Sequence, residues 1–158
     1  MRSDIEVAQA IELHADTVKR LCMVYLKNNA DVEDIFQTVF LKYALSDAAF
    51  ESPEHASAWI VRVTINACKD LLRSVFRRRT VPLDQVTGWT EITDSAHREV
   101  LEAVLSLPEK YRVPIYLHYY EGYTAPEIGK LTHRNVNTVY TLLNRGKRML
   151  KEEVLEDG

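Results

Sequence analysis

The sequence has 158 residues, a length that allows either one sizeable hydrophobic core or two small ones. Apolar residues make up 46% and charged residues 27%, with only five glycines and five prolines, which indicates a helix-rich folded protein and excludes a disordered tail or a turn-dense β-sandwich. The formal net charge of −3 excludes a uniformly basic nucleic-acid-binding protein, but a total charge does not exclude basic surfaces on part of the chain.

The first predicted element is a helix over residues 5–26. Its apolar residues recur three and four positions apart, and they are Ile11, Ala15, Val18, Leu21, Cys22 and Tyr25. The amino-terminal stretch carries acidic residues where a signal peptide needs a basic patch and an apolar run. No stretch approaches the roughly 18 consecutive apolar residues of a membrane span. We therefore expect a soluble, cytoplasmic protein that is not inserted in a membrane.

A second helix is predicted to begin at Asp31, whose carboxylate is suited to cap it. Its apolar stripe follows helical spacing and consists of Val32, Ile35, Phe36, Val39, Phe40 and Tyr43. Its solvent side carries Asp31, Glu33, Asp34 and Gln37. This side is too acidic to approach DNA, so we expect it to face a protein.

A loop over residues 46–54, which contains Pro53, leads to a third helix predicted over residues 54–78. The buried stripe of this helix is predicted to be Ile60, Val63, Ala67, Cys68, Leu71 and Val75. A second face forms a basic ridge of Arg62, Asn66, Lys69, Arg73 and Arg77. Segment 59–80 holds six basic residues and one acidic residue, which indicates contact with phosphate.

Two aromatic residues, Phe50 and Trp59, lie close to this basic ridge in the sequence. Aromatic rings beside arginines can hold unstacked bases while the cations follow the phosphate backbone. Two simpler interpretations stay open, because Trp59 can equally be a core residue and a charged helix face is often only solvated.

Residues 79–93 mix Pro, Gly, Thr and acidic residues without a sustained period, as an interdomain linker does. We therefore predict a first domain over residues 1–79, a linker over 80–95 and a second domain over 96–158.

The second domain is predicted to begin with a short helix that ends at Leu107. Its apolar positions are Val100, Leu101, Val104 and Leu105. Pro108 suits the first turn of the next helix, which runs through Tyr120 and should bend at Pro114. The pair Glu121-Gly122 ends that helix.

The segment 124–151 has the pattern of a helix-turn-helix. Thr124 and Glu127 form a capping box for a short helix, a turn covers residues 132–134, and Asn135 caps a second helix. The inner face of the second helix is predicted to be Val136, Val139, Leu143 and Leu150. Its outer residues would meet base edges in the major groove, although an ordinary helical hairpin with a solvated face fits the pattern equally well.

No catalytic or metal-binding pattern competes with this interpretation. The five histidines are scattered without an HExxH motif, and the sequence contains no nucleophile motif and no glycine-rich phosphate loop. Cys22 and Cys68 are expected to be reduced and buried. We expect no enzyme activity, no metal and no cofactor.

Over residues 10–150 these motifs, in this order, resemble the extracytoplasmic-function (ECF) sigma factors, in regions two and four only. Segment 31–42 is similar to the helix that binds the clamp helices of the largest polymerase subunit, and segment 58–73 to the helix that recognises and melts the −10 promoter element. The resemblance assigns polymerase binding to Asp31, Asp34, Gln37 and Phe40. It assigns −10 recognition to Phe50, Trp59, Arg62, Asn66, Lys69, Asp70 and Arg73, with Phe50 on the loop that captures a flipped base.

Segments 105–112, 119–124 and 136–139 resemble region four, which reads the −35 element as duplex and contacts the polymerase flap. The residues assigned to −35 recognition are Arg134, Asn135, Asn137, Thr138, Tyr140, Thr141, Asn144, Arg145 and Arg148. The turn departs from the family pattern, because Thr132-His133-Arg134-Asn135 replaces the usual Leu-Gly-Ile-Ser. Tyr140-Thr141-Leu142 likewise replaces Lys-Ser-Arg.

The sequence therefore predicts an all-α protein of two small helical domains joined by a linker, the second of them a helix-turn-helix domain. The implied function is a sigma factor that binds core RNA polymerase and promoter DNA and that has an anti-sigma factor as a further partner. Two alternatives stay open at this stage. One is a helical adaptor that binds polymerase or a membrane-bound regulator without reading DNA, and the other is a stand-alone helix-turn-helix repressor.

Overall fold

The structure of the chain is a computed structural model that describes residues 1–26, 29–76 and 95–157. Every regular element in these ranges is a helix, which confirms the all-α prediction. The chain divides into two compact units, Met1–Ile92 and Thr93–Gly158, and each is described by itself. Most of the predicted linker lies outside the described residues, while its last residue, Ser95, begins a helix. No described helix has the length and apolar character needed to cross a bilayer.

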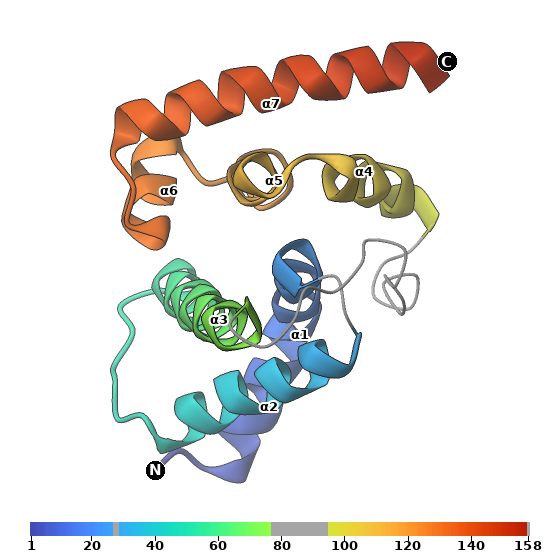
Figure 1. Cartoon of the computed structure of the whole chain (residues 1–158). Helices are drawn as coiled ribbons and strands as arrows, with labels where there is room; N and C mark the ends of the chain where they lie inside the picture. The colour runs from blue at the N-terminus through green and yellow to red at the C-terminus, as the bar shows by residue number, and fades with distance from the viewer. Residues whose placement is uncertain (27–28, 77–94, 158) are drawn as a thin grey trace. The chain divides into compact units, whose positions relative to one another are not determined.

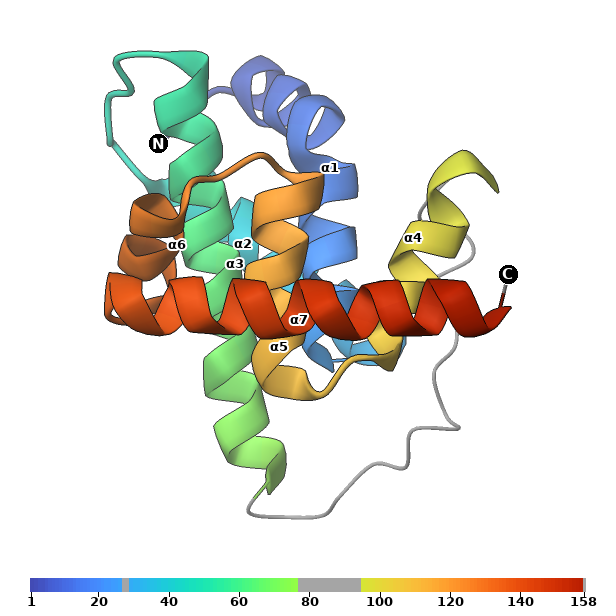
Figure 2. The same ribbon diagram turned by 90° about the horizontal axis from the view of Figure 1, so that it is seen from above.

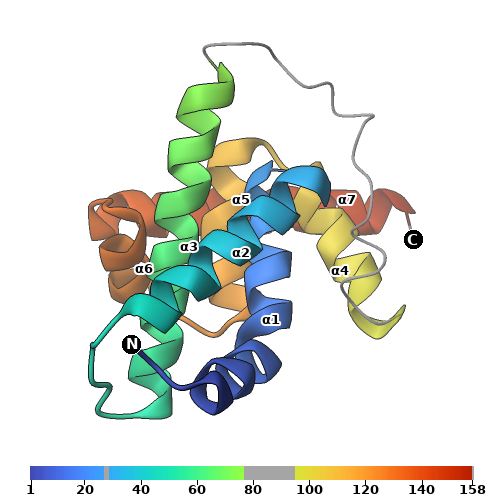
Figure 3. The ribbon, with the colours of Figure 1, turned by 90° about the horizontal axis from the view of Figure 1, so that it is seen from below.

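The described part of the first unit is a bundle of three helices that pack against one another pairwise (Figures 1 and 3). They are α1 (Asp4–Leu26), α2 (Asn29–Leu45) and α3 (Pro53–Phe76). Each contributes an apolar side to one shared core, whose most buried members include Val18, Leu21, Cys22, Val24, Val32, Val39, Ile60, Val61, Ile65 and Cys68.

Two predictions for this unit need correction. Helix α2 begins at Asn29, so Asp31 lies in the first turn and does not cap the helix. A carboxylate in the first turn still stabilises the helix, because it faces the positive end of the helix dipole. On α3, Val61 and Ile65 are fully buried, while the predicted Val63 is only half-buried. The reason is that α3 packs against both α1 and α2, which buries a wider arc than one stripe.

Cys22 on α1 and Cys68 on α3 are free and fully buried, as predicted. Their Sγ atoms lie 3.8 Å apart, which the sequence spacing does not reveal. The hydrogen bond shared with the Cys68 thiol and the burial of the site hold the pKa of the Cys22 thiol well above its usual range. This thiol pair is therefore part of the α1–α3 packing.

The second unit contains α4 (Ser95–Ser106), α5 (Glu109–Ile115), the π-helix η3 (Tyr116–Tyr120), α6 (Ala125–Thr132) and α7 (Val136–Asp157). The long helix α7 crosses α5 and also packs against α4 and α6 (Figure 2). The core at this crossing includes Leu101, Val104, Ile115, Leu117, Ile128, Val139 and Leu143.

The predicted single helix over residues 108–120 has two parts. Pro108 is the N-cap of α5 and so lies just before the first turn. After Pro114 the helix changes type, and in η3 the amide of Glu121 donates to the carbonyl of Tyr116, five residues back, at 3.2 Å. Proline lacks the N–H that an α-helix needs, so a disruption was expected here, but it takes the form of a wider helical turn. The helix ends as predicted, with Gly122 at φ +82°.

Candidate nucleic-acid interface

One exposed face of α2 combines polar and apolar side chains. Asp34, Gln37 and Thr38 are exposed, and Thr38 Oγ1 donates to the Asp34 carbonyl at 2.9 Å. Leu41 and Leu45 continue the same face at positions i+7 and i+11 from Asp34, with exposed fractions of 60% and 59%. We call these five residues the α2 face. Unpartnered leucines at helical spacing indicate a protein contact, and sequence analysis missed them because the acidic residues dominate the pattern.

Phe40 does not take part in this face. Its side chain is only 5% exposed, and its ring centroid lies 4.8 Å from that of Phe36. The ring therefore supports the helix from inside, and the polymerase contact assigned to Phe40 stays a prediction. Asp34 and Gln37 lie on the surface as expected, while Asp31 is half-buried.

The basic ridge of α3 faces solvent as predicted. Arg62, Asn66 and Arg73 are exposed and Lys69 is half-buried, while Arg77 lies outside the described residues. Asp70 forms an exposed ion pair with Arg73 one turn away. This pairing lowers the positive charge that the ridge offers near Arg73, so Arg62 carries the less compensated cation.

Beside the amino-terminal end of α3 lies an aromatic cluster of Tyr43, Phe50, His55 and Trp59. The rings of Phe50 and Trp59 lie 5.8 Å apart, and Tyr43 is 6.4 Å from Phe50 and 6.2 Å from Trp59. His55 approaches Phe50 edge to face at 5.5 Å. The structure thus brings together the two predicted aromatic residues, both half-buried, and adds two that sequence reasoning missed. The helical period of α2 places Tyr43 in its core stripe, and His55 lies one helical turn before Trp59.

The loop between α2 and α3 is held by its own polar groups. Ser52 caps α3, because its Oγ accepts from the amide of His55 at 3.1 Å. The amide of Glu51 donates to His55 Nδ1 at 3.3 Å, and Ser46 Oγ accepts from the amide of Ala48 at 3.1 Å. These bonds fix both ends of the loop that carries Phe50.

In the second unit, side chains fix the starts of both helices of the helix-turn-helix. Thr124 Oγ1 accepts from the amide of Glu127 at 3.3 Å, and Glu127 Oε1 accepts from the amide of Thr124 at 3.0 Å, which confirms the capping box. The hydrogen bonds from Thr124 hold the pKa of the Glu127 carboxyl below its usual range. Asn135 Oδ1 accepts from the amide of Asn137 at 2.8 Å, which confirms Asn135 as the cap of α7.

The turn between α6 and α7 is tight. His133 adopts the left-handed conformation at φ 58°, the position where the resembling family carries glycine. The amide of Arg134 donates to the carbonyl of Gly129 at 2.9 Å, and a Cβ at Gly129 would lie only 2.8 Å from the Arg134 carbonyl oxygen. Gly129 is therefore required by the close approach of the turn to α6. A glycine inside an amphipathic helix was the available sequence signal.

Helix α7 separates its core side from an exposed side. Val139 and Leu143 are buried as predicted, while the predicted Val136 and Leu150 are half-buried. Leu142 and Gly146, which the prediction did not include, are buried as well. All nine residues assigned to −35 recognition are exposed, and they lie in the turn or on α7: Arg134, Asn135, Asn137, Thr138, Tyr140, Thr141, Asn144, Arg145 and Arg148. This side is mixed polar and basic.

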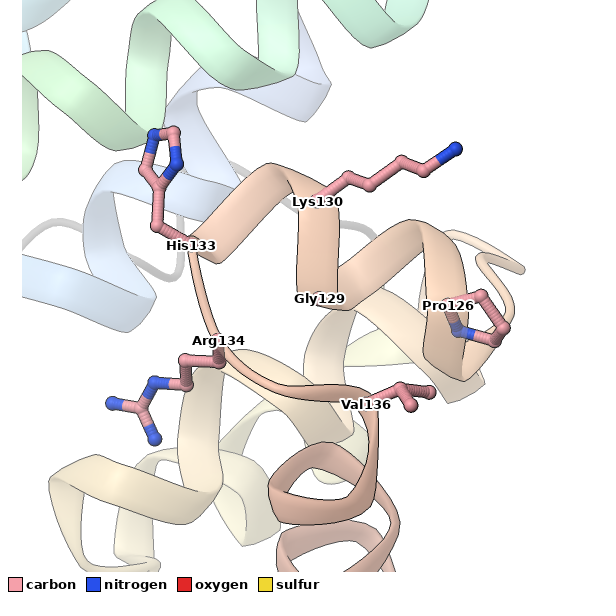
Figure 4. Close-up of a pocket in the computed structure, with 6 residues that line it drawn as sticks. All are labelled: Pro126, Gly129, Lys130, His133, Arg134 and Val136. Atoms are coloured by element: carbon pink, nitrogen blue, oxygen red, sulfur yellow. The ribbon is translucent and has the colours of Figure 1, made fainter.

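An open pocket of about 470 Å³ lies between α6 and the turn (Figure 4). It is lined by Pro126, Gly129, Lys130, His133, Arg134 and Val136. Lys130 and Arg134 carry cations and none of the six lining residues is acidic, so the pocket is suited to an anionic group such as phosphate.

Comparisons with known proteins decide the family. The Sigma-70 region 2 model matches residues 10–79, and the Sigma-70 region 4 model matches residues 97–150. The ECF RNA polymerase sigma factor SigW of Bacillus subtilis is 26% identical, with 93% of this chain and 88% of SigW covered. RNA polymerase sigma factor SigV of the same bacterium is 25% identical over 91% of this chain and 88% of SigV. This chain belongs to the ECF sigma factors.

Solved structures agree on the fold of this sigma factor. The sigma factor RpoE, in a co-crystal structure with the anti-sigma factor NepR from Bartonella quintana, matches with a TM-score of 0.74 and 15% identity over 97% of this chain and 99% of that chain. CnrH, solved in complex with the cytosolic domain of CnrY, matches with a TM-score of 0.66 and 21% identity over 99% of this chain and 92% of that chain. Sigma factors are promoter-recognition subunits of RNA polymerase and do not form an enzyme class.

Proposed function

We propose that this sigma factor divides promoter-specific initiation among three surfaces. The α2 face binds the clamp helices of the largest polymerase subunit. The basic ridge and the aromatic cluster open the −10 element, and the helix-turn-helix reads the −35 element. Residues 1–79 and 96–158 act as the two domains, with 80–95 as their connection. The observation that carries the proposal is the aromatic cluster beside the basic ridge, because an ordinary solvated helix face has no need of it.

The α2 face suits a protein partner better than DNA. Its acidic end repels phosphate, while its exposed leucines gain free energy only when another apolar surface covers them. Leu41 supplies an exposed apolar anchor next to Phe40, the residue to which the resemblance assigns polymerase binding. Asp34 then supplies a charge that selects a basic partner surface.

At the −10 element, cations and rings have different tasks. Arg62 and Lys69 attract the phosphate backbone, which supplies affinity without sequence choice. The half-buried rings of Phe50 and Trp59 offer a surface on which an extruded base stacks, and such stacking contributes about 1–3 kcal/mol per base. Extrusion from the duplex costs a few kcal/mol, so stacking and phosphate contacts together can offset it.

At the −35 element the duplex stays closed. The amino-terminal turns of α7 enter the major groove, where Asn137, Thr141 and Asn144 meet base edges. The pocket beside the turn holds a neighbouring backbone phosphate through Lys130 and Arg134. Its cations orient the helix but carry no sequence information.

The remaining properties follow from this role. The sigma factor has no catalytic activity of its own, and it works in the cytoplasm, where polymerase is found. An anti-sigma factor is a further proposed partner, because RpoE and CnrH of similar fold were each solved with NepR or the cytosolic domain of CnrY. Such a partner would cover one of the three surfaces.

Reconstitution with core RNA polymerase tests the proposal. The purified full chain is added to core polymerase with a library of duplex DNA, bound fragments are recovered, and transcription start sites are mapped. We expect starts at defined positions downstream of two short shared sequence elements. Core polymerase alone gives the background.

The alternatives predict different outcomes. An adaptor would bind core polymerase without selecting fragments, and a stand-alone repressor would select duplex fragments without polymerase, usually as a dimer. Binding to polymerase without start-site selection would therefore refute the proposal.

A further inference from the structure

Arg2 holds the loop that carries Phe50. It precedes the segment that the Sigma-70 region 2 model matches, and its side chain is only 14% exposed. Its backbone amide donates to the carbonyl of Ala44 at 2.9 Å, and its Nε donates to the carbonyl of Tyr43 at 3.0 Å. Its Nη2 donates to the carbonyl of Ala48 in the loop. Arg2 thus bridges the end of α2 and the loop, and Figure 3 shows the amino terminus beside this loop.

Two of these carbonyls belong to the last turn of α2, where a helix leaves its carbonyls without partners inside the helix. A cation at this end is also favoured by the negative pole of the helix dipole. The same guanidinium also donates to the carbonyl of Ala48, which lies three residues after the end of α2. Arg2 also forms an ion pair with Glu6 at 3.5 Å, but the Glu6 side chain is 52% exposed, and such a pair contributes little to holding the guanidinium.

The guanidinium also lies over two rings of the aromatic cluster. Its Cζ is 4.4 Å from the ring centroid of Tyr43 and 5.2 Å from that of Phe50. A planar guanidinium can stack on a ring and donate from its edge at the same time, which an ammonium group cannot do. Arg2 therefore sets both the backbone of the loop and the place of the Phe50 ring.

We infer that Arg2 is a positioning residue for −10 recognition, which keeps the Phe50 loop in its base-binding shape before DNA arrives. The inference rests on the proposed role of the aromatic cluster. A loop that is already ordered does not have to lose conformational entropy when the base enters, so opening is faster and the choice of base is sharper. Arg2 itself is not assigned any contact with DNA.

Amide hydrogen exchange of the full chain tests the positioning step without DNA. We expect Arg2→Gln to raise exchange about tenfold at loop residues 46–52, as expected when the loop loses the charge-assisted hydrogen bond to the Ala48 carbonyl, while amides in the middle of α1 and α3 keep their protection. Arg2→Lys should behave like Arg2→Gln, because an ammonium cannot replace the fork of donors. Glu6→Gln is the matched control and should leave the loop protected. Unchanged loop exchange in Arg2→Gln would overturn the inference.

A second experiment measures promoter opening. Holoenzyme is mixed with a selected promoter fragment that carries 2-aminopurine beside the extruded −10 base, and opening is followed by fluorescence. We expect Arg2→Gln to open about tenfold more slowly and to discriminate less between the selected base and the other three, with unchanged affinity for core polymerase.

The Phe50→Ala variant distinguishes the proposed role of the aromatic cluster from the inferred role of Arg2. If Phe50→Ala opens normally, the proposed role of the aromatic cluster fails. If Phe50→Ala is impaired while Arg2→Gln opens and discriminates normally, only the role of Arg2 is refuted.

Discussion

Replacing Gly146 by alanine should destabilise the second unit, although the same change stabilises most helices. Alanine is ordinarily favoured over glycine inside a helix by about 0.8–1 kcal/mol. At this position a Cβ would lie 2.6 Å from Ile115 Cγ1 and 2.8 Å from Ile115 Cδ1, and 3.4 Å from Tyr111 Cβ. Ile115 is only 1% exposed and cannot turn aside freely, because the core around it is packed.

The clash should exceed the gain in helix propensity. Forcing one methyl group into a packed core costs about 1–3 kcal/mol, so after the gain in helix propensity we expect a net destabilisation of up to about 2 kcal/mol. For a unit of this size, each kcal/mol lowers the melting temperature by about 4–8 °C. Ile115→Ala removes both clashing atoms, so Gly146→Ala in that background should cost less than in the natural chain, with a coupling of about 0.5–3 kcal/mol.

Thermal unfolding of the four proteins of this double-mutant cycle gives the stabilities, and amide exchange on α5 and α7 assigns the change to the second unit. A more stable Gly146→Ala protein, or a double mutant whose losses simply add, would refute the close crossing of α7 over α5.

Further predictions concern the turn between α6 and α7, the pH dependence of stability, polymerase binding and promoter opening. His133→Gly should raise stability by about 0.5–1 kcal/mol, because it removes the strain of a left-handed non-glycine residue, and a lower melting temperature would contradict this. The pKa of the Glu127 carboxyl is lowered in the folded state, so the charged carboxylate stabilises the fold. This stabilisation is complete above the usual glutamate pKa and is lost as pH falls through the lowered pKa. The difference in unfolding free energy between the natural chain and Glu127→Gln should shrink over that range, and a difference independent of pH would count against it. Asp34→Lys should weaken binding to core polymerase at least about tenfold with an unchanged circular dichroism spectrum, and normal binding would remove Asp34 from the interface. Arg73→Ala should spare polymerase binding and slow opening only about two- to fivefold, because Asp70 already compensates its charge; an unaltered opening rate would exclude it from the −10 surface.

Local chemistry explains which parts of the fold were predictable. The Thr124–Glu127 capping box and the Asn135 cap were correctly predicted, because their hydrogen bonds join residues two or three positions apart. The α2 stripe through Val32 and Val39 was predicted because one buried side imposes a clear period.

Contacts between distant segments could not be predicted in the same way. The start of α2 before Asp31 was missed because a good capping residue also suits the first turn. No periodicity in the sequence shows that Cys22 and Cys68 meet, since that depends on how α1 and α3 pack.

The same distinction between local and long-range contacts applies to the candidate site. The exposure of Arg62, Asn66 and Arg73 followed from helical spacing alone. The place of Arg2 over Tyr43 and Phe50 depends on tertiary structure, because it joins residues more than 40 positions apart.

Because α7 keeps its buried side and its exposed side separate, the exposed side can be changed without disturbing the fold. Asn137, Thr141, Asn144 and Arg148 lie along one outward line of the helix, and none of them contributes to the core that Val139 and Leu143 form with the rest of the unit. Libraries randomised at these four positions should therefore retain a high proportion of folded members. On the proposed role of α7, new duplex preferences can be selected among them without compensating mutations elsewhere.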